Sequence, residues 1–170
     1  VSEAENHGLQ VFDLTKLRSV KKFEIFESSA TLKDFGNAHN IWINEESSFA
    51  YVLGSNLYFG GPVFIDISDP KNPQILGGYP NERYTHDAQV VNYIGPDAKF
   101  KGKEIFFGSN SDGGENNRIV ILDVTDKSNP SKISTIDYSG AGYTHQGVLS
   151  EDHRYFFLGD ELDELKFGLK

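Results

Sequence analysis

The stretch Val63-Phe-Ile-Asp66-Ile-Ser68 decides the fold, because its pattern occurs three times in the 170-residue chain. The other copies are Gln10-Val-Phe-Asp13-Leu-Thr15 and Val120-Ile-Leu-Asp123-Val-Thr125. The Asp positions of successive copies lie 53 and 57 residues apart. Branched and aromatic residues favour β-strands, and a fixed period of this length indicates a repeat architecture.

A tight turn is predicted after the second and third copies, at Asp69-Pro-Lys-Asn-Pro73 and Asp126-Lys-Ser-Asn-Pro130. An Asp side chain at the start of a turn accepts a hydrogen bond from the backbone two residues on, and Pro interrupts the strand ladder. A short strand is expected after each turn, at residues 74–79 and 132–138, and residues 21–26 take this place in the first copy. We expect the repeated Asp residues to brace the strands rather than to act in catalysis.

Two more apolar runs precede the repeated strand in each full period, so that each period predicts four short strands. The runs are residues 41–44 and 49–53 in the second period, and 88–93 and 104–108 in the third. Four antiparallel strands in about 50 residues form a propeller blade. A β-sandwich also has short strands, but it does not require Asp, turn and His to repeat in phase.

The predicted fold is therefore an all-β propeller of four-stranded antiparallel blades, with about three blade periods in one domain. Its parts are a partial blade at residues 1–35, blades at 36–80 and 81–140, and a partial blade at 141–170. Propellers typically close with four to eight blades, and an open ring leaves strand edges free to pair. We expect an incomplete ring or a fragment, completed by missing blades or by other chains.

Composition narrows the function classes. The net charge of -9 argues against nucleic acid, whose phosphates attract basic surfaces. The chain has no Cys, which excludes disulfides, thiolate metal sites and a Cys nucleophile. It has no apolar run long enough to span a bilayer. It starts at Val1 and contains no Met, so we expect a mature, processed or truncated piece of a longer precursor.

A histidine recurs where each innermost strand is predicted to begin. The copies are Asn37-Ala-His39-Asn, Tyr84-Thr-His86-Asp87 and Tyr143-Thr-His145-Gln146. The topology of a blade brings these positions to one end of the central channel, which we call the mouth face. We expect a ligand site there, formed by residues of the second and third copies: Tyr84, His86, Asp87, Tyr143, His145 and Gln146.

The same face offers candidate metal ligands: His39, His86, His145, Asp160 and Glu161. Imidazole suits a divalent transition metal, whereas carboxylates suit Ca²⁺, and either ion is compatible with this set. The loop at residues 110–117 is rich in oxygen ligands but lacks the spacing of an EF-hand. Alternatively, the Thr-His pairs tie neighbouring blades together through hydrogen bonds and bind no ligand.

The strand cores Val63-Phe-Ile-Asp-Ile and Ile119-Val-Ile-Leu-Asp-Val resemble the LVIVD repeat. With the Tyr-Thr-His segments and Gly159-Asp-Glu-Leu-Asp-Glu164, the pattern is similar to the choice-of-anchor B family of bacterial surface proteins. This resemblance implies an exported propeller tethered to the cell surface. The resemblance does not indicate a particular reaction.

The expected function is a binding or interaction module that acts through its His- and acid-lined mouth face. One alternative is a metal-dependent hydrolase or lyase with its site at the channel mouth, and another is a purely structural scaffold. The chain has no Gly-x-Ser-x-Gly elbow, phosphate-binding glycine loop or His-Glu-x-x-His pair, so enzyme activity stays undecided.

Overall fold

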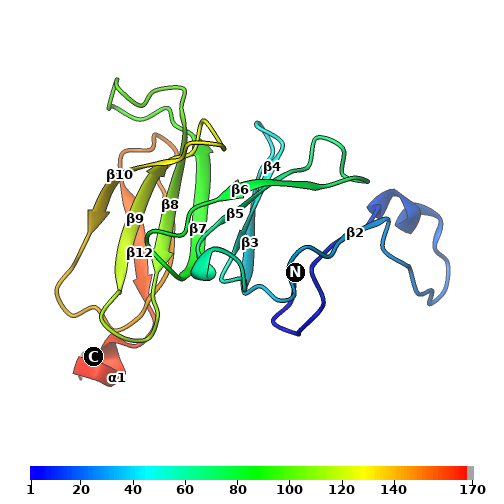
Figure 1. Ribbon diagram of the computed structural model, residues 1–170, viewed down its shortest axis with the longest axis horizontal. Coiled ribbons are helices and arrows are strands. Elements are labelled where there is room, and N and C mark those ends of the chain that lie inside the picture. The colour runs from blue at the N-terminus through cyan, green and yellow to red at the C-terminus, as the bar shows by residue number, and fades with distance from the viewer. Residues whose placement is uncertain (168–170) are drawn as a thin grey trace.

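The computed structural model describes residues 1–167 and shows the predicted all-β architecture (Figure 1). Two four-stranded antiparallel sheets are flanked by two two-stranded sheets. The first flanking pair contains β1 (Leu9–Val11) and β2 (Ala30–Leu32). The second contains β11 (Thr144–Leu149) and β12 (Phe156–Asp160). The sheets are propeller-like blades that do not close into a ring within the described residues.

Each four-stranded sheet follows chain order from its innermost to its outermost strand. The strands of the first blade are β3 (Asn40–Asn44), β4 (Phe49–Leu53), β5 (Val63–Asp66) and β6 (Gln74–Gly78). Those of the second are β7 (Thr85–Asn92), β8 (Glu104–Asn110), β9 (Arg118–Asp123) and β10 (Ser131–Ile136). Short helical segments lie outside the blades: η1 (Leu14–Ser19), η2 (Tyr58–Gly60) and α1 (Asp163–Phe167).

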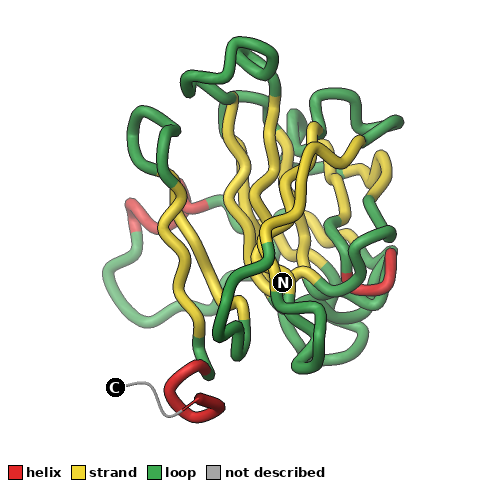
Figure 2. The backbone as a smooth tube through the Cα atoms, turned by 90° about the vertical axis from the view of Figure 1, so that its left-hand side faces the viewer, coloured by secondary structure: helices red, strands yellow, loops and turns green. Residues whose placement is uncertain are grey.

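The innermost strands of successive sheets are neighbours, because β7 contacts both β3 and β11. Figure 2 shows the strands as separate layers linked by loops at both ends. The mouth face lies at the lower side of Figure 1, where α1 follows β12. None of the helices in residues 1–167 has the length and hydrophobicity that a bilayer span requires.

Alternation along the strands packs one sheet against the next. In β8, Phe106 is fully buried in the cluster that joins this blade to Tyr51 and Phe64 of the preceding one. Its neighbours Ile105 and Phe107 point to the opposite side and line a pocket under β11 and β12. Successive side chains of a strand face opposite sides of the sheet, so each blade has two apolar faces.

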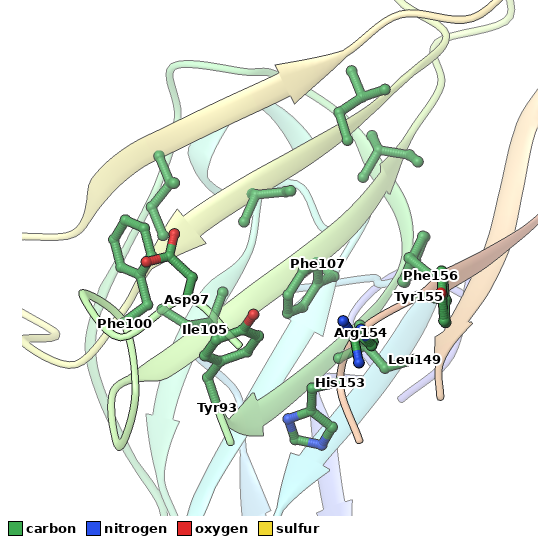
Figure 3. Close-up of a pocket in the computed structure, with 14 residues that line it drawn as sticks. Tyr93, Asp97, Phe100, Ile105, Phe107, Leu149, His153, Arg154, Tyr155 and Phe156 are labelled. Carbon is green, nitrogen blue, oxygen red and sulfur yellow. The ribbon is translucent and has the colours of Figure 1, made fainter. Parts of the chain in front are cut away.

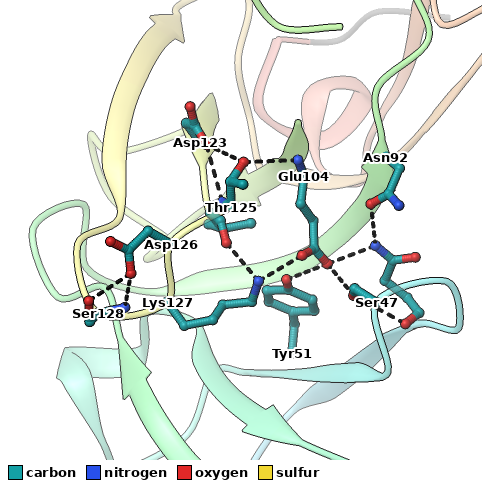
Figure 4. A network of polar contacts seen from close by, with 11 residues as sticks. Ser47, Tyr51, Asn92, Glu104, Asp123, Thr125, Asp126, Lys127 and Ser128 are labelled. Carbon is teal, nitrogen blue, oxygen red and sulfur yellow. Dashed lines mark hydrogen bonds and ion pairs between the residues drawn. The ribbon is translucent and has the colours of Figure 1, made fainter. Parts of the chain in front are cut away.

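A buried polar network joins the two blades at the end opposite the mouth (Figure 4). The Glu104 carboxylate of β8 accepts hydrogen bonds of 2.7, 2.6 and 2.7 Å from Asn44, Ser47 and Tyr51 of the preceding blade. Its second oxygen lies 2.7 Å from Nζ of Lys127. The network satisfies a buried carboxylate that would otherwise destabilise the core.

The repeated Asp residues have the expected bracing role. Oδ1 of Asp13, Asp66 and Asp123 accepts a hydrogen bond from the backbone N–H two residues on, at 3.0, 2.8 and 3.1 Å. Asp69 and Asp126 begin the predicted turns with the same type of bond, at 3.0 and 2.9 Å. The Asp bonds therefore hold the chain in the same local conformation at the same point of each repeat.

The first repeat differs from the prediction. Residues 21–26 form no strand, and β2 at Ala30–Leu32 pairs with β1 instead. Phe23 and Ile25 are 89% and 77% exposed, whereas Leu32 is buried against Leu9. A strand needs a face to bury, and in this structure residues 21–26 have none.

Candidate functional site

The three repeated histidines meet in one row at the mouth face. The ring centroids of His39 and His86 lie 4.1 Å apart, and those of His86 and His145 lie 4.7 Å apart. We call these three residues the histidine row. The row crosses three successive sheets, because each histidine lies at the start of an innermost strand. This convergence agrees with the position that the sequence predicts.

Two β-bulges direct the second and third histidines. β7 and β11 begin at Thr85 and Thr144, so His86 and His145 lie inside strands. The pairing of β7 with β8 shifts between Thr85 and Asp87, and that of β11 with β12 shifts between Thr144 and Gln146. In both sheets the histidine is the residue without a partner across the ladder. Bulges re-aim side chains and are frequent beside functional sites.

Two tyrosines pack across the sheets against the histidine row. Tyr143 meets the His86 ring edge to face, with centroids 5.1 Å apart, and Tyr84 lies 6.4 Å from His39. Each tyrosine therefore contacts the histidine of the preceding repeat. Burial, followed by the charges of Tyr143 and Glu3, raises the pKa of Tyr84 to about 12, so its phenol stays protonated at neutral pH.

Gly54 makes room for this packing. Its φ is +60°, and a Cβ added there would lie 2.7 Å from Cβ of His39 and 2.9 Å from the hydroxyl of Tyr84. A side chain at this position would therefore be strained by its backbone and would also clash with both aromatic residues. The sequence contained this glycine in a loop, but nothing in the pattern indicated its contact with the row.

A carboxylate lies at each end of the histidine row. Glu3 pairs with Nδ1 of His39, and Oε2 of Glu161 lies 3.7 Å from Nε2 of His145. One ligand atom from each of His86, His145 and Glu161 lies within 4.8 Å of the other two. Among the described residues, this is the group whose chemistry and spacing match a metal site. Glu3 was missed by sequence reasoning because it precedes the first repeat.

His86 is held as a neutral imidazole. Burial lowers its pKa below the ordinary value of 6.5, against the raising effect of its hydrogen bond to His145. In that bond Nδ1 of His86 lies 2.9 Å from the backbone carbonyl of His145. A carbonyl only accepts, so Nδ1 carries the proton and Nε2 keeps its lone pair.

The other predicted site residues lie near the row but in different environments. Asp87 accepts a 2.8 Å hydrogen bond from Asn40 of the neighbouring blade, and with Gln146 it lines a hollow of about 440 Å³ beside β11. Asp160, in contrast, accepts hydrogen bonds from Tyr138 and from three backbone N–H groups. Its carboxylate shapes the loop before His145 and is outside the group of three ligand atoms.

The polar groups of the oxygen-rich loop at residues 110–117 are hydrogen-bonded to other groups of the protein. Oδ1 of Asp112 accepts a 2.9 Å bond from the backbone of Gly114, and Asn117 donates a 3.0 Å bond to the carbonyl of Gly142. No group of ligand atoms in residues 1–167 includes Asp112. Asp112 instead lines a pocket of about 520 Å³ on the same face, with Tyr84 and the exposed Phe59.

Comparison with known proteins agrees with the repeats. Residues 35–80 and 113–137 match the family model of the LVIVD repeat. The first segment spans the whole β3–β6 sheet, and the second spans β9 and β10. No curated protein and no solved structure matches the chain. The chain is thus a propeller-like all-β protein in which two segments match the LVIVD repeat.

Proposed function

We propose that this chain is a binding module that takes up a cationic ligand at its mouth face. The observation that supports this proposal is the histidine row, in which side chains from three successive repeats meet between two carboxylates. The side chains of His145 and Glu161 are 35% and 51% exposed, which leaves this end of the row open to a ligand. Carboxylates and aromatic faces both favour a positively charged partner.

Backbone strain beside the row supports a binding role over a bracing role. Tyr58, Phe59 and Arg83 have φ values of +49°, +55° and +57°, which bulky side chains rarely adopt. Phe59 and Arg83 line the pocket that Tyr84 also lines. Strain of this kind gathers at ligand sites, where the surrounding structure holds it in place.

We also propose that the module is extracytoplasmic and anchored at a bacterial cell surface, as the resemblance to choice-of-anchor B proteins implies. Further strands would complete the ring, supplied by more polypeptide or by other chains. Within residues 1–167, the edge strand β12 pairs only with β11. The pocket lined by residues of β8 to β12 (Figure 3) leaves room for the further strands that we propose.

Amide chemical shifts of the whole chain, titrated separately with Zn²⁺, Ca²⁺ and a trilysine peptide, test the binding role. We expect at least one probe to shift saturably the amides around the histidine row. The His86→Ala/His145→Ala variant should lose this response with a melting temperature close to that of the parent. A collapse in melting temperature, with no response of the parent to any probe, would identify the histidines as blade braces.

A further inference from the structure

We propose that the mouth face holds one divalent transition-metal ion, with His86, His145 and Glu161 as its protein ligands. This inference rests on the proposed binding function and names its ligand class. Two imidazoles and one carboxylate form a ligand set found in zinc and non-haem iron sites. Imidazole nitrogen is a softer ligand than oxygen, so it favours such an ion over Ca²⁺, which is bound by six to eight oxygen atoms.

The hydrogen-bonded orientation of the His86 ring already suits a metal ligand. Its Nδ1–H donates to the carbonyl of His145 at 2.9 Å, so the lone pair on Nε2 is available. Metal-binding histidines characteristically donate their other ring N–H to a carbonyl or carboxylate, which fixes the tautomer and the ring orientation.

The distances allow the site to close by side-chain movement alone. Zinc bonds of about 2.0–2.2 Å place tetrahedral ligand atoms about 3.4 Å apart. Nε2 of His145 and Oε2 of Glu161 are already 3.7 Å apart, and a ring nitrogen of His86 lies within 4.8 Å of a ligand atom of each residue. Glu161 is half exposed and follows the end of β12, so its side chain is free to turn inward.

The surrounding residues give the site its shape. The two β-bulges present His86 and His145 to the same space, and Tyr143 closes one side of His86. His39 stacks on the other side at 4.1 Å and is oriented by Glu3. Three protein ligands leave a coordination position open on the exposed side, where a water molecule or a ligand group would bind.

Isothermal titration of the chelator-treated whole chain with ZnCl₂ tests the site, with elemental analysis of the dialysed complex as a second readout. We expect one equivalent of zinc, and a Co²⁺ complex with the visible absorption of a low-coordinate site. Replacing either histidine by Ala should weaken zinc binding on the order of 100-fold or more, since even outer-shell changes cost 10–100-fold.

Of the three ligand substitutions, Glu161→Gln should disturb folding least, because the Glu161 side chain lies at the surface. It should also weaken zinc binding, with an unchanged melting temperature, whereas Glu164→Gln in α1 and His7→Ala should bind zinc as the parent does. The absence of zinc binding in the parent, or equal affinity in Glu161→Gln and the parent, would overturn the metal site. If trilysine shifts the amides around the histidine row but zinc does not bind, the metal site alone is overturned. If no probe shifts these amides, the proposed binding function is overturned too.

Discussion

Nζ of Lys127 lies 2.7 Å from Oε2 of Glu104, and the side chains of both residues are more than nine-tenths buried. Lys127 comes from the turn between β9 and β10, and Glu104 begins β8. Because Asn44, Ser47 and Tyr51 of the preceding blade donate to the same carboxylate, the pair belongs to the joint between two blades.

Lys127→Met is expected to destabilise the chain by about 3–5 kcal/mol, because it leaves the buried Glu104 carboxylate without its cation. Chemical denaturation followed by circular dichroism measures the change. Lys103→Met is the matched control on the same blade, since Lys103 pairs with Asp123 at 2.6 Å but is 42% exposed. The control substitution should lower the free energy of unfolding by about 1 kcal/mol or less. Equal losses in both variants would contradict the role of the buried pair.

Stability should fall in acid through the same carboxylate. Burial alone would raise the pKa of Glu104, but hydrogen bonds from Lys127, Ser47, Tyr51 and Asn44 outweigh burial and hold the pKa below the ordinary value of 4.5. A lowered pKa in the folded state contributes stability that is present above 4.5 and is lost as the pH falls through the folded value. The free energy of unfolding, measured across this range, should depend less on pH in Glu104→Gln than in the parent.

Gly54→Ala should both destabilise the chain and disturb the mouth face. The added Cβ meets His39 and Tyr84 at less than 3 Å, and the φ of +60° is strained for alanine. Gly102→Ala separates the two effects, because Gly102 also has a positive φ (+78°) but has open space around it. The unfolding midpoint should fall further for Gly54→Ala, and only this variant should shift the His39 resonances.

Asp160→Asn should lower stability by about 1–3 kcal/mol while leaving the metal stoichiometry at one. Its carboxylate accepts bonds from Tyr138, Gly142, Tyr143 and Leu162, and the amide replaces one accepting oxygen by a donor. Thermal unfolding and elemental analysis of the same sample give both values. Loss of zinc without loss of stability would instead assign Asp160 as a ligand, as the sequence suggested.

The pocket under β11 and β12 should make the 170-residue chain self-associate. Its lining includes Ile121, Ile136 and Phe107, and no second pair of strands covers it in the described chain (Figure 3). Sedimentation velocity should show a mass that rises with concentration. Ile136→Lys, which places a charge at a partly exposed position, should shift the chain to monomer. A parent that stays monomeric at all concentrations would count against the open edge as an assembly surface.

The repeat pattern predicted the fold well because its signals are local. Unbroken runs of apolar residues mark β4 and β5, and an Asp with Asn-Pro three residues further on marks the turns at Asp69 and Asp126. The strand at residues 21–26 was wrong because the choice between it and β2 depends on which apolar side chains find a face to bury. No local pattern contains that information.

The candidate site was predictable in outline only. In-phase repetition brought His39, His86 and His145 to one face, but it could not show the carboxylate of Glu3 or the bulges. It also gave Asp160 and Glu161 equal weight as ligands, although they are adjacent. The choice between them depends on backbone N–H groups of the loop before His145, which only the folded chain brings together.

At His86 and His145, the bulges separate the pairing of the strand from the choice of side chain at the mouth face. The side chain of an ordinary strand residue packs beside that of its cross-strand partner, so exchanging it disturbs this contact. His86 and His145 have no such partner, whereas Thr85 and Asp87 on either side keep theirs. The blade can therefore exchange the side chain that it presents at the mouth face without altering the register of the strand.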